Sequence, residues 1–227
     1  KFQDFSKHII PILLKKKFKV SSFYSREYIK DAGTVDRIKQ VQNDIKSRKF
    51  HKQNINKKIP AVFLDKDGVL NKQVDSKHYQ NIKKIYPNIV KAIKIINAKS
   101  YLVVVVTNQP AIAKGIVKET KVLEDFRYLE TYLGLRGCYI DRIYYCPCHP
   151  DRGFKGEIKK FKRICSWRKP NNGMILHATK KLNIDLKKSV MIGDSEVDYL
   201  AAKKSQLNFL LIGNKFDSKK IKKFKNL

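Results

Sequence analysis

Four polar side chains follow directly on short apolar runs of this sequence: Asp65 and Asp67 after one run, Thr107 and Asp194 after two others. If each run is a strand of a parallel sheet, these side chains meet at the sheet edge where ligands bind. Three aspartates gathered there need a cation between them, and an all-oxygen donor set favours Mg²⁺. Thr107 alone would fit a helix N-cap, but the set favours an active site.

Such a cluster of carboxylates has a defined chemistry. A carboxylate beside a metal ion can attack phosphorus as a nucleophile. A second carboxylate two residues later, as Asp67 is to Asp65, can protonate the leaving oxygen and then activate water. A metal and a nearby lysine would neutralise the transferring group. The residues therefore predict phosphoryl transfer through an aspartyl-phosphate.

The elements that must position these residues alternate along the chain. Apolar runs without polar interruptions indicate strands buried on both faces, as in a parallel sheet covered by helices. We predict an α/β fold with a doubly wound parallel sheet over residues 58–227, and a short α+β extension with a linker over residues 1–57. The expected strands are 61–64, 102–106, 141–145, 189–192 and 209–212, and the expected helices are 89–98, 119–133, 172–182 and 199–205. In the extension we expect a helix at 8–14, a strand at 20–24 and a helix at 35–50.

The composition narrows the classes of protein to which the chain can belong. With 227 residues, of which 42% are hydrophobic, it can bury a core, which argues against a disordered chain. No apolar run approaches the roughly 20 residues that cross a bilayer, and no signal peptide opens the sequence, so we expect a cytoplasmic protein without membrane segments. The four cysteines do not suggest a disulfide framework. Because the sequence opens on Lys1, we expect a piece of a longer protein.

The net charge of +30 raises the question of nucleic acid. Only nine of the 50 basic residues are arginine, and the lysines are spread along the whole chain without interleaved stacking aromatics. This distribution favours a compositional bias, and nucleic acid is not the expected partner. A basic nucleic-acid-binding module or a polynucleotide-end phosphatase remains the alternative from another class.

Three motifs in a fixed order resemble the haloacid-dehalogenase (HAD) phosphatase superfamily: DKDGVL at 65–70, TN at 107–108 and GDSEVD at 193–198. The resemblance implies a Rossmann-like fold, Mg²⁺ dependence and an aspartyl-phosphate intermediate. The roles it implies are Asp65 as nucleophile and metal ligand, Asp67 as general acid/base with its backbone carbonyl on the metal, Thr107 on the phosphoryl group, Lys169 as neutralising charge, Asp194 as metal ligand and Asp198 as a positioning group.

Further motifs narrow the resemblance. TNQ at 107–109, IAKG at 112–115, YYCP at 144–147 and RKP at 168–170 are similar to the D-glycero-D-manno-heptose-1,7-bisphosphate 7-phosphatases. This family is essentially capless and removes the 7-phosphate of its substrate; its close relatives, the histidinol-phosphate phosphatases, are the alternative. The implied substrate-site residues are Asn108, Gln109, Lys114 and Arg168. Lys114 stands where the family usually has arginine, so a bidentate phosphate contact is lost.

One loop departs from the family pattern. The family holds it with zinc through Cys-x-His and Cys-x-Cys, whereas the matching positions here are Cys146, Cys148, Cys165 and Trp167. Tryptophan cannot bind zinc, so the implied structural zinc site is Cys146, Cys148 and Cys165 with His149 or a water. The alternative is a metal-free loop with buried thiols.

The first residues resemble a different family. DFSK at 4–7, IIP at 9–11 and YIKDAGT at 28–34 are similar to the C-terminal end of sugar-phosphate nucleotidyltransferases, over roughly residues 4–50. The resemblance implies a parent protein that fuses a nucleotidyltransferase to the phosphatase. It favours heptose over histidinol phosphate, because nucleotide-activated heptose, a precursor of lipopolysaccharide and surface polysaccharide, requires such a transfer step. An unrelated helical extension is the alternative.

Overall fold

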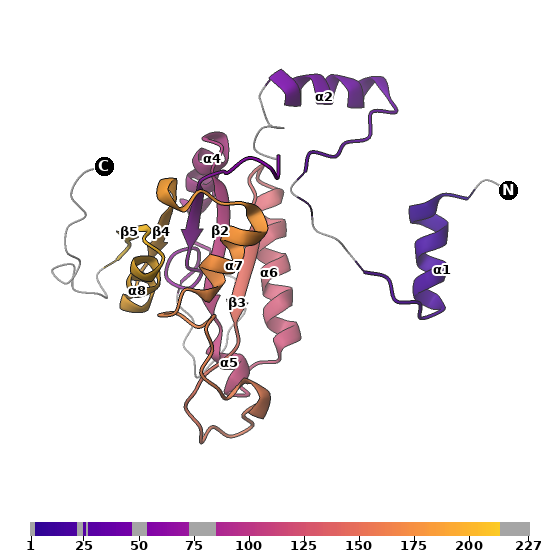
Figure 1. The fold of residues 1–227 in the computed structure, drawn as a ribbon. Coiled ribbons are helices and arrows are strands. Elements are labelled where there is room, and N and C mark those ends of the chain that lie inside the picture. The colour runs from indigo at the N-terminus through magenta and orange to yellow at the C-terminus, as the bar shows by residue number, and fades with distance from the viewer. Residues whose placement is uncertain (1–2, 22–24, 26, 47–53, 73–84, 214–227) are drawn as a thin grey trace.

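The computed structural model describes residues 3–21, 25, 27–46, 54–72 and 85–213, and its centre is a single five-stranded sheet (Figure 1). The strands run in the order β3-β2-β1-β4-β5, and every neighbouring pair is parallel. The predicted doubly wound α/β fold is confirmed. The strands are β1 (Ala61–Leu64), β2 (Leu102–Asn108), β3 (Arg142–Cys146), β4 (Val190–Gly193) and β5 (Asn208–Leu211).

Helices cover both faces of the sheet. Side chains of α4 (Ile89–Ala98) and α6 (Glu119–Gly134) pack into one apolar cluster, and those of α7 (Gly173–Leu182) and α8 (Glu196–Lys204) pack into another on the opposite face. The short helix α5 (Pro110–Ala113) and the 3₁₀ turns η2 (Lys159–Phe161) and η3 (Leu186–Lys188) complete this part of the chain.

The two central strands show why their sequences contain no polar interruption. In β1, Ala61 and Phe63 belong to the cluster with α7 and α8, whereas Val62 and Leu64 belong to the cluster with α4 and α6. The valines of β2 alternate between the same two clusters. Both faces of these strands are buried, so both side-chain sets are apolar.

Most predicted boundaries agree with the structure to within one or two residues, and β1 and α4 agree at both ends. The exception is α8, which begins at Glu196, three residues before the predicted start. Ser195 precedes it, and Asp198 accepts hydrogen bonds from the backbone and the hydroxyl of Ser195, at 3.2 and 2.5 Å. This capping contact starts the helix earlier than its apolar residues suggest.

The N-terminal extension contains η1 (Phe5–Ile9), a π-helical turn, followed by α1 (Ile10–Lys15) and α2 (Val35–Lys46). None of these elements contributes a buried residue. The predicted strand at 20–24 falls mostly outside the described residues, as does the end of the predicted helix beyond residue 46. In the part of the chain that the structure describes, no helix combines the length and apolar character needed to cross a membrane.

Candidate active site

The candidate site lies at the carboxyl ends of the three central strands. Asp65 follows β1, Thr107 lies at the end of β2, and Asp194 follows β4. In the strand order, β2 and β3 lie on one side of β1, whereas β4 and β5 lie on its other side. The carboxyl end of β1 is therefore the topological switch point, where ligands bind in open α/β sheets.

Lys169 comes from the segment before α7 and inserts its ammonium group among these strand ends. Nζ lies 2.8 Å from Oδ1 of Asp65 and 2.6 Å from Oδ1 of Asp198, and it donates to the carbonyl of Val106 at 2.9 Å. The side chain is only 3% exposed. Three acceptors match the three hydrogens of an ammonium, so this buried charge is fully satisfied.

The protonation of Asp65 is the main electrostatic feature of the site. Burial raises the pKa of Asp65 to about 7, and the charges of Asp198 and Asp67 add to that rise while Lys169 opposes it. Burial acts to lower the pKa of Lys169, but the attraction of Asp65 and Asp198 outweighs it and raises that pKa. The two raised pKa values have related causes: the groups are buried, and the site holds more carboxylates than cations.

Three carboxylates are arranged to share a cation. Oxygen atoms of Asp65, Asp194 and Asp198 lie within 4.8 Å of one another. Gly68 leaves room for Asp194, because a Cβ there would lie 2.0 Å from its Oδ2, and the φ of Gly68, +93°, disfavours other residues. An oxygen-only donor set with excess negative charge fits Mg²⁺. The carboxylate of Asp67 lies outside this group; the ligand predicted from that residue is its backbone carbonyl.

Asp67 contacts side chains that the sequence had not connected with it. Gln109 Nε2 donates to Asp67 Oδ2 at 3.1 Å and to the hydroxyl of Thr107 at 3.0 Å. Asn71 and Lys66 contact Oδ1 of the same carboxylate. Lys66 and Asn71 were missed by the sequence reasoning, and the only available signal was their position within four residues of Asp67.

Of the predicted substrate residues, Asn108 lies against the backbone of Lys169. Its amide nitrogen donates to the Lys169 carbonyl at 3.0 Å, and its oxygen accepts from the Lys169 N–H at 3.0 Å. Arg168 is half-buried and donates to the Cys148 carbonyl at 3.2 Å, and burial lowers its pKa. Lys114 Nζ lies 4.6 Å from the centre of the Phe154 ring.

The predicted zinc loop brings three thiols together. The sulfurs of Cys146, Cys148 and Cys165 lie within 4.8 Å of one another, with Cys146 and Cys165 3.6 Å apart. The three cysteines are among the residues that line a cavity of about 470 Å³. His149 is not part of this group of ligand atoms; its buried Nδ1 has no hydrogen-bond partner among the described residues. Trp167 packs against His177, with ring centroids 5.0 Å apart.

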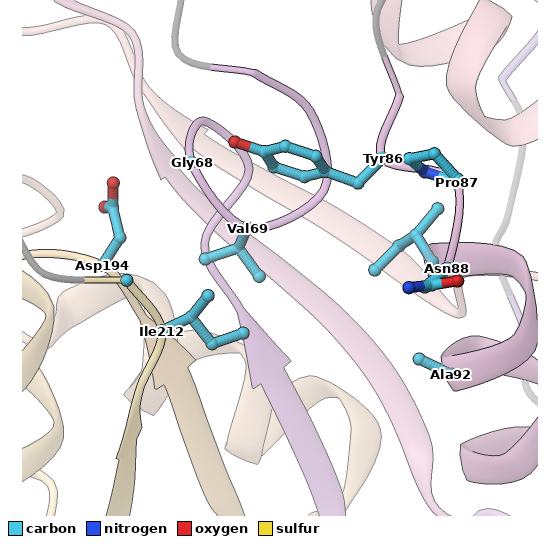
Figure 2. A pocket seen from close by; sticks show the side chains of 10 residues that line it. Gly68, Val69, Tyr86, Pro87, Asn88, Ala92, Asp194 and Ile212 are labelled. Atoms are coloured by element: carbon cyan, nitrogen blue, oxygen red, sulfur yellow. The ribbon is translucent and has the colours of Figure 1, made fainter.

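A second cavity, of about 480 Å³, borders Asp194 and is lined mainly by apolar groups (Figure 2). Tyr86 and Pro87 border it next to the start of α4, and Ile212 borders it after β5. In Figure 2 the ring of Tyr86 reaches across the turn at Gly68. Among the described residues that line this cavity, Asp194 is the only charged one, and none of the predicted substrate residues Asn108, Gln109, Lys114 and Arg168 lines it.

Comparison with known proteins agrees with this geometry. The HAD-hydrolase-like family model matches residues 166–225. The D-glycero-β-D-manno-heptose-1,7-bisphosphate 7-phosphatase of Photorhabdus laumondii is 39% identical over 144 residues, which cover 63% of this chain and 74% of the relative.

Solved structures give the same result. A candidate HAD-like phosphatase from Mesorhizobium loti is 30% identical with a TM-score of 0.62, covering 69% of this chain and 74% of that one. The D,D-heptose 1,7-bisphosphate phosphatase from B. bronchiseptica, complexed with magnesium and phosphate, is 27% identical with a TM-score of 0.58, covering 67% of this chain and 80% of that one. The chain is a HAD-type phosphatase and belongs to the family of the D-glycero-β-D-manno-heptose-1,7-bisphosphate 7-phosphatases.

Proposed function

We propose that this chain hydrolyses the 7-phosphate of D-glycero-D-manno-heptose 1,7-bisphosphate in a Mg²⁺-dependent reaction. The observation that carries the proposal is the buried group formed by Asp65, Lys169, Asp194 and Asp198 at the switch point of the sheet. Its relatives of known name act on this sugar bisphosphate. The product, a heptose 1-phosphate, would serve nucleotide-heptose synthesis.

The proposed nucleophile is Asp65. One carboxylate oxygen of Asp65 attacks phosphorus while the bond from phosphorus to the sugar oxygen breaks. A sugar alkoxide is a poor leaving group, so Asp67 donates a proton to that oxygen. In the second half, Asp67 takes a proton from water as the water oxygen bonds to phosphorus. The bond from phosphorus to the Asp65 oxygen breaks, which regenerates the Asp65 carboxylate and frees inorganic phosphate.

The other residues would stabilise the charge on the phosphoryl group. Mg²⁺ held by the side chains of Asp65 and Asp194 and the backbone carbonyl of Asp67 would supply positive charge at the phosphoryl oxygens. The Nζ of Lys169 lies 2.8 Å from Oδ1 of Asp65 and would add a second positive charge beside the nucleophile. The buried hydroxyl of Thr107 is suited to donate to a phosphoryl oxygen.

Binding of the sugar and of its second phosphate is proposed for Lys114 and Arg168, whose positive charges lie on the neighbouring loops. Asn108 would act by holding the Lys169 backbone in place. A structural zinc is also proposed for the three thiols, because two thiolates bound to tetrahedral zinc at about 2.3 Å lie roughly 3.8 Å apart. The separation of 3.6 Å between Cys146 and Cys165 supports this assignment.

The test is phosphate release with Mg²⁺ from heptose 1,7-bisphosphate, fructose 1,6-bisphosphate, histidinol phosphate and a 3′-phosphorylated oligonucleotide. We expect the highest kcat/KM for the heptose. We also expect Asp65→Asn to lower its kcat by at least about a thousandfold with the fold intact, since an amide cannot act as the nucleophile. A preference for histidinol phosphate or the oligonucleotide would contradict the substrate, and near-native turnover by Asp65→Asn would contradict the mechanism.

A further inference from the structure

Three side-chain donors converge on the carboxylate of Asp67. Lys66 Nζ lies 2.5 Å and Asn71 Nδ2 lies 2.8 Å from Oδ1, and Gln109 Nε2 lies 3.1 Å from Oδ2. Both oxygens therefore have a partner inside the protein. The Asp67 side chain itself is 26% exposed, so it remains accessible to a substrate while buried donors hold its orientation.

The donors are themselves held firmly. Lys66 and Asn71 are each 1% exposed, and Gln109 is 3% exposed. Asn71 uses both ends of its amide, because Oδ1 accepts from Lys66 at 3.4 Å and Nδ2 also donates to the Lys72 carbonyl at 2.8 Å. A buried ammonium group costs free energy unless it is paired, so the burial of Lys66 favours its ion pair with Asp67.

Gln109 alone among the three donors also contacts Thr107. Its Nε2 also donates to the Thr107 hydroxyl at 3.0 Å. An amide nitrogen carries two hydrogens, and these two bonds use both, which leaves none for a sugar hydroxyl. The Thr107 oxygen accepts one of these bonds, so its own hydrogen is free to point at a phosphoryl oxygen.

We propose that Gln109 is a positioning residue that ties the general acid/base Asp67 to Thr107, with Lys66 and Asn71 completing a clamp on the Asp67 carboxylate. The inference rests on the proposed function. It departs from the role that family resemblance implies for Gln109, which is contact with the substrate.

The clamp matters because Asp67 acts twice from one position. In the first half-reaction its proton goes to the leaving oxygen as the bond from Asp65 to phosphorus forms. In the second half-reaction Asp67 takes a proton from the attacking water as that bond breaks. Proton transfer requires the carboxyl oxygen within hydrogen-bond reach of each partner, so a carboxyl free to rotate would slow both halves.

Substrates with different leaving groups separate the contributions of Asp67 to the two half-reactions. With the sugar bisphosphate, we expect Gln109→Met to lower kcat by about 10- to 100-fold while KM stays within about twofold. With p-nitrophenyl phosphate, whose phenolate leaves without a proton, we expect stopped-flow traces to show a burst of nitrophenolate followed by slow turnover. The burst arises because only the second half-reaction then depends on Asp67.

Gln42→Leu is the matched control, since Gln42 is exposed on α2, and it should leave both assays unchanged. Gln109→Asn, which keeps the amide but withdraws it by one methylene, replaces Gln109→Met if circular dichroism shows that the methionine variant is unfolded. A raised KM with native kcat would assign Gln109 to substrate binding and overturn the inference, as would native kcat without a burst.

Asp65→Asn distinguishes this inference from the proposed function. An inactive Asp65→Asn together with native kinetics in the Gln109 variants would reject only the clamp. Native turnover by Asp65→Asn would reject the proposed mechanism as a whole.

Discussion

Asp65 is buried beside Lys169, and its proposed roles as nucleophile and metal ligand both require an ionised carboxylate. Its neighbours Asp194 and Asp198 are also buried, at 6% and 0% exposed. In the described part of the site, the ammonium group of Lys169 is the positive charge that lies close to these carboxylates. An additional cation would remove the remaining repulsion, which explains why metal binding and the protonation of Asp65 should be linked.

This linkage predicts a pH-dependent metal affinity. The pKa of Asp65 is raised to about 7, chiefly by burial, so the carboxyl gains a proton as pH falls through that value. A protonated carboxyl is a poor metal ligand, so Mg²⁺ should bind about tenfold more weakly near pH 6 than near pH 8. Isothermal titration calorimetry at the two pH values measures the change.

Asp65→Asn provides the comparison, because an amide does not titrate. In that variant the difference in Mg²⁺ affinity between the two pH values should shrink to within about twofold. Equal affinities in the unaltered protein would show that Asp65 does not compete with a proton for the metal.

At the scale of elements, the segment between β3 and α7 determines much of the site. It carries two of the three converging thiols as well as Arg168 and Lys169, and Trp167 stands within it. Burial raises the pKa of Cys148. In Cys165 burial acts in the same direction, but N–H groups of Trp167 and Arg168 and the neighbouring thiols lower its pKa. A metal that binds thiolates would remove the cost of burying these groups and hold the segment to β3.

We therefore expect the protein purified without chelators to contain about one zinc per chain by mass spectrometry of metal content. Cys148→Ser should reduce that content severalfold and lower Tm, because it removes one of three converging thiols. Cys138→Ser is the control, since the Cys138 thiol lies in the core near the Leu133 carbonyl and outside the group. Zinc-free native protein, or equal zinc in the Cys148 variant, would contradict the site.

At the scale of the whole molecule, the extension differs from the phosphatase fold. Its described helices bury no residue, and apolar side chains such as Ile29 and Val35 are 82% and 68% exposed. A link to the phosphatase part of the chain is the bond that the side-chain amide of Asn183 donates to the Ile55 carbonyl, at 2.9 Å. The resemblance of this extension to a nucleotidyltransferase end, and the division at residues 57 and 58, remain predictions.

Removing residues 1–53 should leave the phosphatase fold and its activity nearly unchanged. Because the lost helices contribute nothing to the core, we expect Tm to shift by no more than about 2 °C and kcat/KM to stay within about twofold. Differential scanning calorimetry and phosphate release measure the two quantities. A drop in Tm of more than about 5 °C would show that the extension is part of the folding unit.

Much of the fold was predictable because its signals are local. The apolar run of β1 and the apolar face of α4 each specify their element, and the structure agrees with both at their ends. The start of α8 was mispredicted because a capping contact, between Ser195 and Asp198, overrode the apolar pattern. The proximity of Asp65 and Asp194 followed from one rule, that parallel strands bring their carboxyl ends to one edge. The third carboxylate of the group is Asp198 from α8, and not Asp67 as the strand ends had suggested.

The sequence by itself determined the α/β class, the strand ends that carry the carboxylates and the family, because residue type and spacing along the chain encode them. Only the tertiary structure decided the direction of each polar side chain. Asn108 ends β2 and Gln109 follows it, where substrate ligands would lie. The Gln109 amide instead binds Asp67 and Thr107, and the Asn108 amide binds the Lys169 backbone. His149 is adjacent to Cys148 but stays outside the thiol group. These contacts form where the fold brings donors and acceptors from distant segments within about 3 Å of each other. The spacing of residues along the sequence does not determine which segments meet in this way.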